Sequence, residues 1–159
     1  MREPFLELGA SAVPNSRATH AIDRDSKKKT IHMADTLYRE ERETTKEQFE
    51  RRLQSMDYKF GFNYNTKKFP WPNNSFKIVY SRASLGNYGN PSHAFKESYR
   101  VLKRGGKLIF DMNGTKEELL RIKSKLVNIG FVEISIRVGN PYTYKGKTKY
   151  SAKISAIKG

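Results

Sequence analysis

The chain has 159 residues, enough for one domain with a substantial core, which we expect to span residues 1–159. It contains no cysteine, which excludes disulfides, cysteine nucleophiles and thiolate metal sites. The three histidines are scattered without metal-ligand spacing, so we expect no metal. No apolar run approaches the roughly 20 residues of a membrane helix, and the first residues do not resemble a signal peptide. The sequence therefore predicts a cytoplasmic protein without a membrane partner.

The charge is strongly positive and unevenly distributed. The formal net charge is +15, from 31 basic and 16 acidic residues. Residues 100–159 hold 14 basic residues against 4 acidic ones, which is two thirds of the net charge. Such an excess predicts attraction to polyanions, nucleic acid among them. A lysine-rich, solvated surface is the alternative.

The first half of the chain contains four predicted strands and one charged helical insertion. Residues 5–8 form a short apolar strand that ends at Gly9, and residues 18–22 form a second strand that ends at Asp23. Residues 34–56 are predicted to be helical, as one helix or two, because Phe49, Leu53 and Met56 recur at helical spacing. Strands are expected at residues 58–62 and 76–80, separated by a turn-rich segment.

The second half alternates helices and strands before a terminal pair of strands. A helix is predicted from Pro91 to about residue 102, and a strand at residues 107–110. Thr115 and Glu118 form a capping box for a helix over residues 116–128. Strands at residues 132–138 and 150–157 follow, joined by a link. This order predicts an α/β fold with a mostly parallel sheet and an antiparallel C-terminal strand.

Three segments together resemble one protein family. They are LELGAS at residues 6–11, AID at residues 21–23, and FPWPNNSFKIV at residues 69–79 followed by FKESYRVLKRGG at residues 95–106. The last pair is the most specific and is similar to the "LPFPDNSFD…, …E..RVLKPGG" run of the type 11 methyltransferase domain. The chain is thus identified as resembling a class I, S-adenosylmethionine-dependent methyltransferase over about residues 5–114. The resemblance implies a Rossmann-like methyltransferase fold and S-adenosylmethionine as cofactor.

The resemblance also implies which residues contact the cofactor. An open α/β sheet binds ligands at the carboxyl ends of its strands. By position in the motifs, Asp23 corresponds to the acidic residue that accepts the ribose hydroxyls, and Asn65 to the residue that binds the adenine amino group. The full set of expected cofactor-binding residues is Glu7, Gly9, Ser11, Asp23, Asn65 and Ser81. A carboxylate after a strand is also a common turn former or helix cap, and an Asn in a turn-rich segment is often structural.

The chain departs from the family pattern in its first motif. Ser11 stands where the family has the second glycine of G-x-G. Asp23 follows Gly9 by only 14 positions, whereas a strand, helix and strand need about 30, so the first crossover helix must be shortened or absent. No catalytic residue can be named. The candidates near the carboxyl edge are Ser84, Asn87, Tyr88 and His93, of which His93 is favoured as a cap or surface residue.

Two functions follow from these observations. The first is a methyltransferase with an unspecified methyl acceptor. The alternative is a catalytically degenerate member of the fold that binds nucleic acid through its basic C-terminal half. Lys145, Lys147, Lys149 and Lys153 share one parity, so in a strand they would project from one side, with Tyr144 and Tyr150 on the other. An edge strand protected by lysines against aggregation would show the same pattern.

Overall fold

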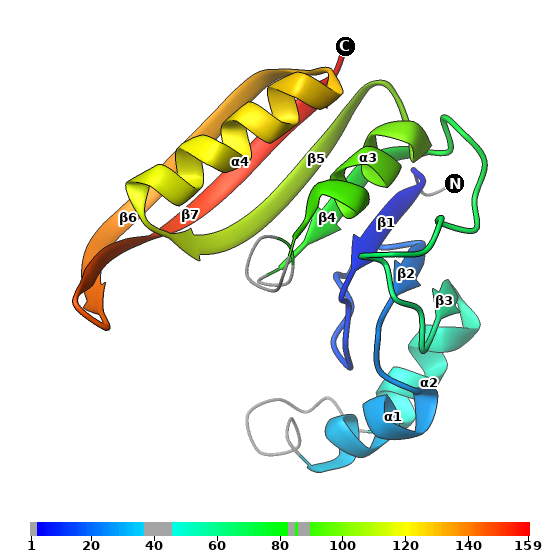
Figure 1. The fold of residues 1–159 in the computed structure, drawn as a ribbon. Coiled ribbons are helices and arrows are strands. Elements are labelled where there is room, and N and C mark those ends of the chain that lie inside the picture. The colour runs from blue at the N-terminus through cyan, green and yellow to red at the C-terminus, as the bar shows by residue number, and fades with distance from the viewer. Residues whose placement is uncertain (1–2, 37–45, 83–84, 86–89) are drawn as a thin grey trace.

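The computed structural model describes residues 3–36, 46–82, 85 and 90–159, and these form one sheet with helices (Figure 1). The strands are β1 (Phe5–Leu8), β2 (His20–Ile22), β3 (Asp57–Lys59), β4 (Phe76–Ser81), β5 (Leu102–Gly114), β6 (Phe131–Tyr144) and β7 (Lys147–Lys158). The helices are α1 (Lys27–Thr36), α2 (Lys46–Gln54), α3 (Ser92–Val101) and α4 (Lys116–Ile129). The elements follow the predicted order along the chain.

The seven strands are arranged in the order β3-β2-β1-β4-β5-β7-β6. The first five of these pair in parallel, and β7 pairs antiparallel with both β5 and β6. This confirms the α/β class, the mostly parallel sheet and the antiparallel C-terminal strand. Because β7 lies between β5 and β6, the edge of the sheet on this side is β6.

β1 and β2 are joined without a helix, as their short separation predicts. Residues 9–19 form a loop that includes Pro14, and the amide of Ala18 donates to the carbonyl of Asn15 across a turn (3.0 Å). Leu6 and Leu8 of β1 lie opposite His20 and Ile22 of β2 in a parallel register. The first crossover helix of the fold is therefore absent.

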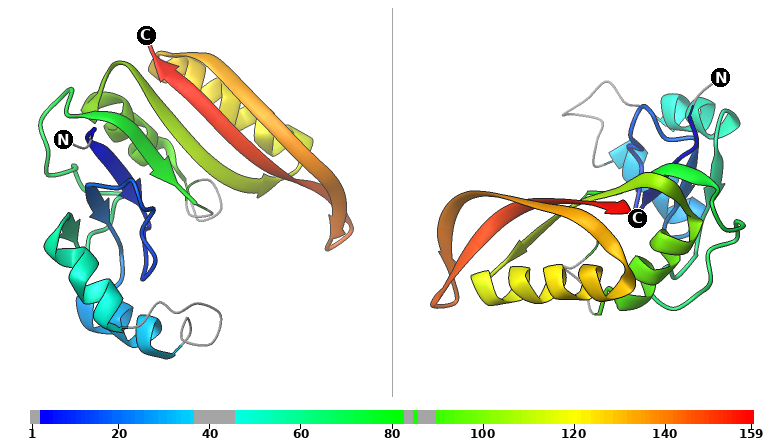
Figure 2. Two further views of the ribbon diagram at one scale, coloured as in Figure 1. Left: turned by 180° about the vertical axis from the view of Figure 1, so that it is seen from behind. Right: turned by 90° about the horizontal axis from the view of Figure 1, so that it is seen from above.

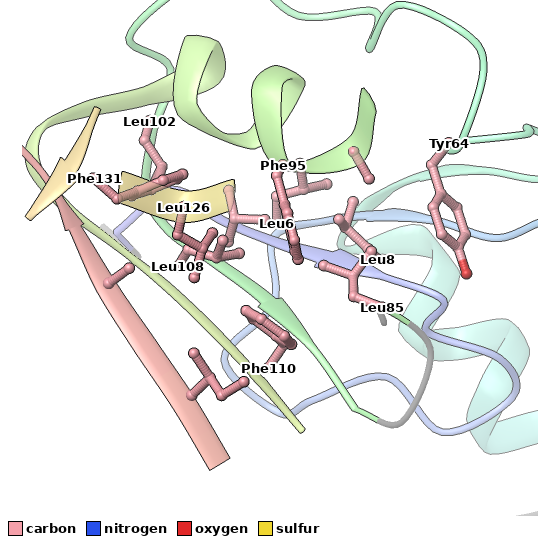
Figure 3. Close-up of a cluster of buried hydrophobic side chains, with 14 of the residues drawn as sticks. Leu6, Leu8, Tyr64, Leu85, Phe95, Leu102, Leu108, Phe110, Leu126 and Phe131 are labelled. Atoms are coloured by element: carbon pink, nitrogen blue, oxygen red, sulfur yellow. The ribbon is translucent and has the colours of Figure 1, made fainter. Parts of the chain in front are cut away.

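The main core lies between the sheet and helices α3 and α4. Leu6, Phe95, Phe110 and Leu126 are fully buried there, from β1, α3, β5 and α4 respectively (Figure 3). The two helices cover the same face of the sheet, whereas α1 and α2 lie beyond the end of β2 (Figures 1 and 2). Over β5, β6 and β7 the opposite face carries no helix in the described part of the chain (Figure 2).

Several predicted boundaries are wrong. β5 extends over Leu102–Gly114 where residues 107–110 are predicted, and β3 ends at Lys59 instead of residue 62. The first helix of the insertion begins at Lys27, earlier than expected, and residues 37–45 of the predicted helical segment lie outside the described residues. The predicted link at residues 139–149 belongs to the last two strands, which turn at Lys145 and Gly146 with positive φ angles of 49° and 75°. A bulge between Val138 and Pro141 lets β6 continue past its proline. None of the helices in the described part is long and apolar enough to cross a membrane.

Candidate functional site

Three strands bring the expected site residues to one edge of the sheet. Leu8 at the end of β1 pairs with Ile22 at the end of β2 and with Ser81 at the end of β4. Because these strands are parallel, the residues that follow them emerge at the same edge. Gly9 and Asp23 are therefore neighbours, with Ser81 fully buried on the other side of β1.

The loop after β1 is folded against the end of β2. The amide of Gly9, whose φ is +69°, donates to the carbonyl of Ile22 at 2.8 Å. The amide of Ser11 donates to Oδ2 of Asp23 at 2.7 Å, and Ser11 itself has a φ of +53°. A left-handed backbone favours glycine, which explains why the related motifs carry a second glycine at this position. In this chain the position holds a serine, and the hydrogen bond from its amide to Asp23 stabilises the left-handed conformation.

Asp23 is 7% exposed and forms two local hydrogen bonds. Besides the Ser11 amide, its carboxylate accepts the amide of Asp25 through Oδ1 at 2.8 Å. Burial raises the pKa of Asp23 above its ordinary value. Each carboxylate oxygen can accept a second hydrogen bond, so the group can serve as a turn former and still accept a pair of hydroxyls.

Glu7 lies beneath the same loop and is 3% exposed. Its Oε1 accepts the amide of Asn15 at 2.6 Å, which fixes the middle of the loop to β1. Burial raises the pKa of the Glu7 carboxyl to about 7. Glu7 therefore positions the loop instead of facing outward toward a ligand.

Two residues that the sequence did not single out complete the support of the loop. The hydroxyl of Tyr58 in β3 donates to the carbonyl of Ser11 at 2.8 Å. Arg52 in α2 donates to the carbonyls of Asn15 (2.8 Å) and Ala18 (2.9 Å). Their partners are backbone carbonyls far away in the sequence, so no side-chain motif indicates either contact. The charged insertion thus stabilises the loop that replaces the first helix.

Asn65 lies on a turn that follows the segment paired with Asp23. The amides of Gly61 and Phe62 donate to the carbonyls of Asp25 and Asp23, both at 2.9 Å, and this brings the start of the segment to the end of β2. The turn itself is formed by Asn63, whose Oδ1 accepts the amide of Asn65 at 3.1 Å. The half-buried Asn65 thus lies three positions after a residue whose amide bonds the carbonyl of Asp23.

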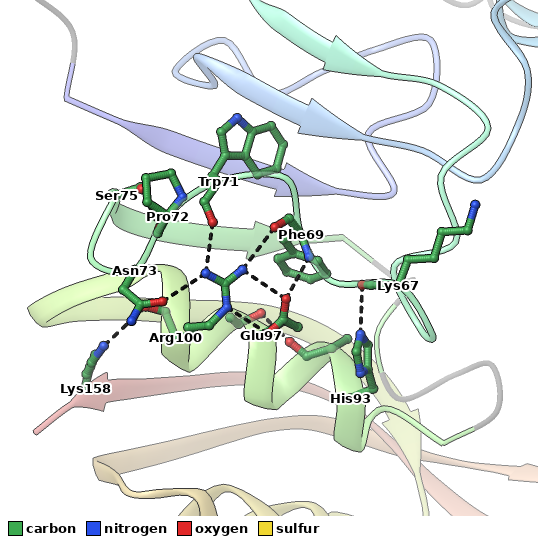
Figure 4. Close-up of polar contacts among 12 residues, drawn as sticks. Lys67, Phe69, Trp71, Pro72, Asn73, Ser75, His93, Glu97, Arg100 and Lys158 are labelled. Atoms are coloured by element: carbon green, nitrogen blue, oxygen red, sulfur yellow. Dashed lines mark hydrogen bonds and ion pairs between the residues drawn. The ribbon is translucent and has the colours of Figure 1, made fainter.

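The catalytic candidates are only in part described. Ser84, Asn87 and Tyr88 lie outside the described residues. A ring nitrogen of His93, near the start of α3, bonds the carbonyl of Lys67 at 2.8 Å (Figure 4). His93 therefore stabilises the loop after Asn65, which is the structural role that the sequence favours, although it does not cap its own helix. Among the described residues, no three His, Asp or Glu side chains gather as a metal site.

Arg100 of α3 fixes the loop of the most specific motif (Figure 4). Its guanidinium donates to the carbonyls of Phe69 (3.0 Å) and Trp71 (2.9 Å). It also pairs with Glu97 through Nε and Oε2 at 2.9 Å, while Oε1 of Glu97 accepts the amide of Phe69 at 2.7 Å. The glutamate and arginine of this motif are therefore structural, because they bind the chain between β3 and β4 to α3.

A methyltransferase of the Rossmann-like class is the kind of protein that this sheet and this edge define. The profile of the methyltransferase domain family matches residues 19–110, more than half of the chain. The chain belongs to this methyltransferase domain family, as the motifs predict. S-adenosylmethionine is the cofactor of the family.

Solved methyltransferases share the fold at low sequence identity. Phosphoethanolamine N-methyltransferase 2 of Haemonchus contortus, solved with S-adenosyl-L-methionine, has a TM-score of 0.70 and 14% identity, over 98% of this chain and 48% of that one. A putative methyltransferase of Bacillus halodurans has a TM-score of 0.65 and 13% identity, over 98% of this chain and 92% of that one. The chain spans about half the length of the Haemonchus contortus enzyme. No curated protein sequence matches it at a significant level.

Proposed function

We propose that this chain binds S-adenosylmethionine at the carboxyl edge of β1, β2 and β4 and transfers its methyl group to an acceptor. The position of Asp23 carries the proposal, since it is a carboxylate at the end of β2, held beside the loop that follows β1. In this assignment Asp23 accepts hydrogen bonds from the ribose hydroxyls, and Asn65 accepts one from the adenine amino group. Gly9 and Ser11 lie beside the methionine part of the cofactor, with Glu7 and Ser81 beneath it.

The bound cofactor supplies a methyl group already activated on a sulfonium. The task of the protein is then to hold donor and acceptor in line, which contributes much of the rate in such displacements. Glu7, Arg52 and Tyr58 serve this task by fixing the loop at residues 9–18 through hydrogen bonds to its backbone at 2.6 to 3.1 Å. In the transfer, a lone pair of the acceptor would form a bond to the methyl carbon as the bond from the sulfonium sulfur to that carbon breaks. S-adenosylhomocysteine would leave, and a proton released by the acceptor would pass to water, so we assign no general base.

A specific observation favours the second candidate, a degenerate member of the family that has lost the cofactor. The amides of Gly9 and Ser11 donate within the chain, to the Ile22 carbonyl (2.8 Å) and the Asp23 carboxylate (2.7 Å). These amides are therefore not free to bind the carboxylate of a ligand, whereas the remaining lone pairs of Asp23 can still accept hydrogen bonds from hydroxyl groups. Cofactor binding by the wild-type chain distinguishes the two candidates.

Calorimetric titration with S-adenosylhomocysteine tests the proposal. Asp23→Asn keeps an oxygen acceptor for the Ser11 amide but removes the charge that strengthens bonds to the ribose hydroxyls. We expect this variant to lose about 1.5–3 kcal/mol of binding free energy, the contribution of hydrogen bonds to a charged group.

The matched control is Asp25→Asn. The Asp25 side chain lies two positions away and pairs with Lys29 at 3.0 Å, so the same charge is removed without touching the expected ribose contacts. We expect near wild-type affinity for it. Equal affinity in all three proteins would show that Asp23 does not bind the ribose. No heat of binding with wild type would favour the degenerate protein.

A further inference from the structure

The hairpin of β6 and β7 carries basic and aromatic side chains on one face. Cross-strand partners share a face of a sheet, and here Tyr144 pairs with Lys147, Tyr142 with Lys149, and Arg137 with Lys153. We call these six residues the basic-aromatic face. Arg137, Lys147 and Lys153 are exposed, and residues 134–159 contain six basic residues and no acidic one. Its acidic neighbours come from other elements: Asp111 of β5 pairs with Lys153, and Glu118 of α4 interacts with Lys149. Positive charge still exceeds negative charge on this face.

Tyr144 lies beside the lysines of this face, which corrects one prediction from the sequence. The Nζ atoms of Lys145 and Lys149 lie 5.4 and 5.2 Å from the centre of the Tyr144 ring. The prediction that Tyr144 points away from the lysines is therefore wrong, because the antiparallel pairing places it opposite Lys147. Tyr150 does lie on the other face, where it packs against the core.

The basic-aromatic face extends from the edge of the sheet at which the cofactor site lies. Gly114, the last residue of β5, pairs with Tyr150, so the hairpin turn lies beyond the carboxyl end of β5 (Figures 1 and 2). A hollow of about 420 Å³ lies at the base of the hairpin, lined in part by Asp111, Arg137 and Lys153. A chain-like ligand on the hairpin would therefore continue toward the end of β5, which neighbours β4.

Protection of a sheet edge does not account for this arrangement. Over residues 150–157 β7 is paired on both sides, with β5 and with β6. Lys153 is thus on an interior strand, where no open edge needs a lysine. Only Lys147 and Lys149 lie on the stretch of β7 that pairs with β6 alone. The positive charge continues past the region where an edge exists.

We propose that the basic-aromatic face binds single-stranded nucleic acid and that this nucleic acid is the methyl acceptor. Lysine and arginine contact the phosphates, and exposed aromatic rings stack on unpaired bases, which is the usual combination in single-strand binding. Tyr142 and Tyr144 are 40% and 51% exposed, so their rings are accessible for stacking. A duplex would offer the lysines its phosphates but would leave both rings without unstacked bases. The inference rests on the proposed function, whose acceptor it specifies.

The first test measures binding of a fluorescent 20-nucleotide single-stranded RNA by anisotropy at several salt concentrations. Lys147, Lys149 and Lys153 are changed together to Gln. The matched control changes Lys103, Arg104 and Lys107 to Gln, which removes three exposed positive charges at the amino end of β5. For a single strand, each phosphate contact contributes roughly 0.7 to the slope of log affinity against log salt concentration. We therefore expect this slope to be smaller by up to about 2 in the hairpin variant and unchanged in the control.

The second test separates stacking from charge. Tyr144→Ser removes the ring and is expected to weaken binding about tenfold, whereas Tyr144→Phe keeps the ring and is expected to bind like wild type. Equal loss in both variants would overturn the stacking contact. A duplex of the same sequence should bind more weakly than the single strand.

Transfer of a labelled methyl group from S-adenosylmethionine to the RNA completes the experiment. We expect transfer with wild type and the control, and reduced transfer with the hairpin variant, which should still bind S-adenosylhomocysteine like wild type. Four results would each overturn the inference. They are equal salt slopes in the hairpin variant and the control, tighter binding to duplex than to the single strand, binding to phosphatidylserine vesicles but not to RNA, and RNA binding without methyl transfer. Failure of wild type to bind S-adenosylhomocysteine would instead overturn the proposed function.

Discussion

The side chains of Glu7, Asp23 and Tyr58 hold the backbone of the loop after β1, which in a longer first motif is held by a helix and a second glycine. Ser11 adopts a φ of +53°, and its amide and carbonyl are held by Asp23 and Tyr58 at 2.7 and 2.8 Å. Glu7 holds Asn15 at 2.6 Å from within the protein interior. A buried carboxyl with few partners favours its protonated form, which makes the stability of this loop depend on pH.

The first prediction concerns Glu7. Its pKa is 4.5 in the unfolded chain and about 7 when folded, so the folded protein binds the proton more strongly. The stabilisation by this proton is complete below pH 4.5 and is lost as the pH rises through about 7. Glu7→Gln is neutral at every pH and keeps an acceptor for the Asn15 amide.

We therefore expect the free energy of unfolding of Glu7→Gln, relative to that of wild type, to increase between pH 5 and pH 8. One pKa unit corresponds to 1.36 kcal/mol, so the increase should reach up to about 3 kcal/mol. Urea unfolding at both pH values without ligand measures this difference. Glu3→Gln, which removes a surface carboxylate paired with Lys77 at 3.1 Å, is the control and should show no such change. A constant difference between wild type and Glu7→Gln would mean that Glu7 is ionised throughout.

At the scale of elements, the parts that depend on local sequence were predictable and those that depend on distant pairing were not. The capping box of Thr115 and Glu118 starts α4 where expected, because both partners lie within one turn. The lengths of β6 and β7 were underestimated, since residues 139–148 are exposed and their strand conformation depends on cross-strand pairing. The start of α1 at Lys27 was missed because its first turn is lysine-rich and has no apolar stripe.

The second prediction concerns the contact between α3 and the loop before β4. Arg100 is 20% and Glu97 12% exposed in their side chains, so the pair is largely shielded from water. Arg100→Met leaves Glu97 without its charge partner and two loop carbonyls without donors. We expect a loss of about 3 kcal/mol in the free energy of unfolding, as for other shielded pairs broken on one side.

Urea denaturation measures this loss, with Arg104→Met as the matched control on an exposed position. The control should change the stability by less than about 0.5 kcal/mol. A double-mutant cycle with Glu97→Gln should give a coupling energy above about 1 kcal/mol. Additive effects would show that the two side chains stabilise the loop independently.

For the whole molecule, the sequence predicted the class of fold, its missing helix and the edge of the sheet at which Gly9 and Asp23 meet. These depend on the order of elements and on the spacing of Gly9 and Asp23, both of which are visible in the chain. It did not indicate that the Gly9 and Ser11 amides bond within the protein, nor that Arg52 and Tyr58 hold the loop. Those contacts arise only when strands and insertion are brought together.

Hydrogen exchange with and without S-adenosylhomocysteine tests most directly whether the carboxyl edge binds the cofactor. A ligand held by Asp23 and Asn65 should slow amide exchange in peptides covering residues 9–25 and 60–67 by restricting their opening. Peptides from α4 serve as the internal control and should exchange unchanged. Absence of protection at saturating ligand, or protection confined to the hairpin of β6 and β7, would contradict the assignment of this site.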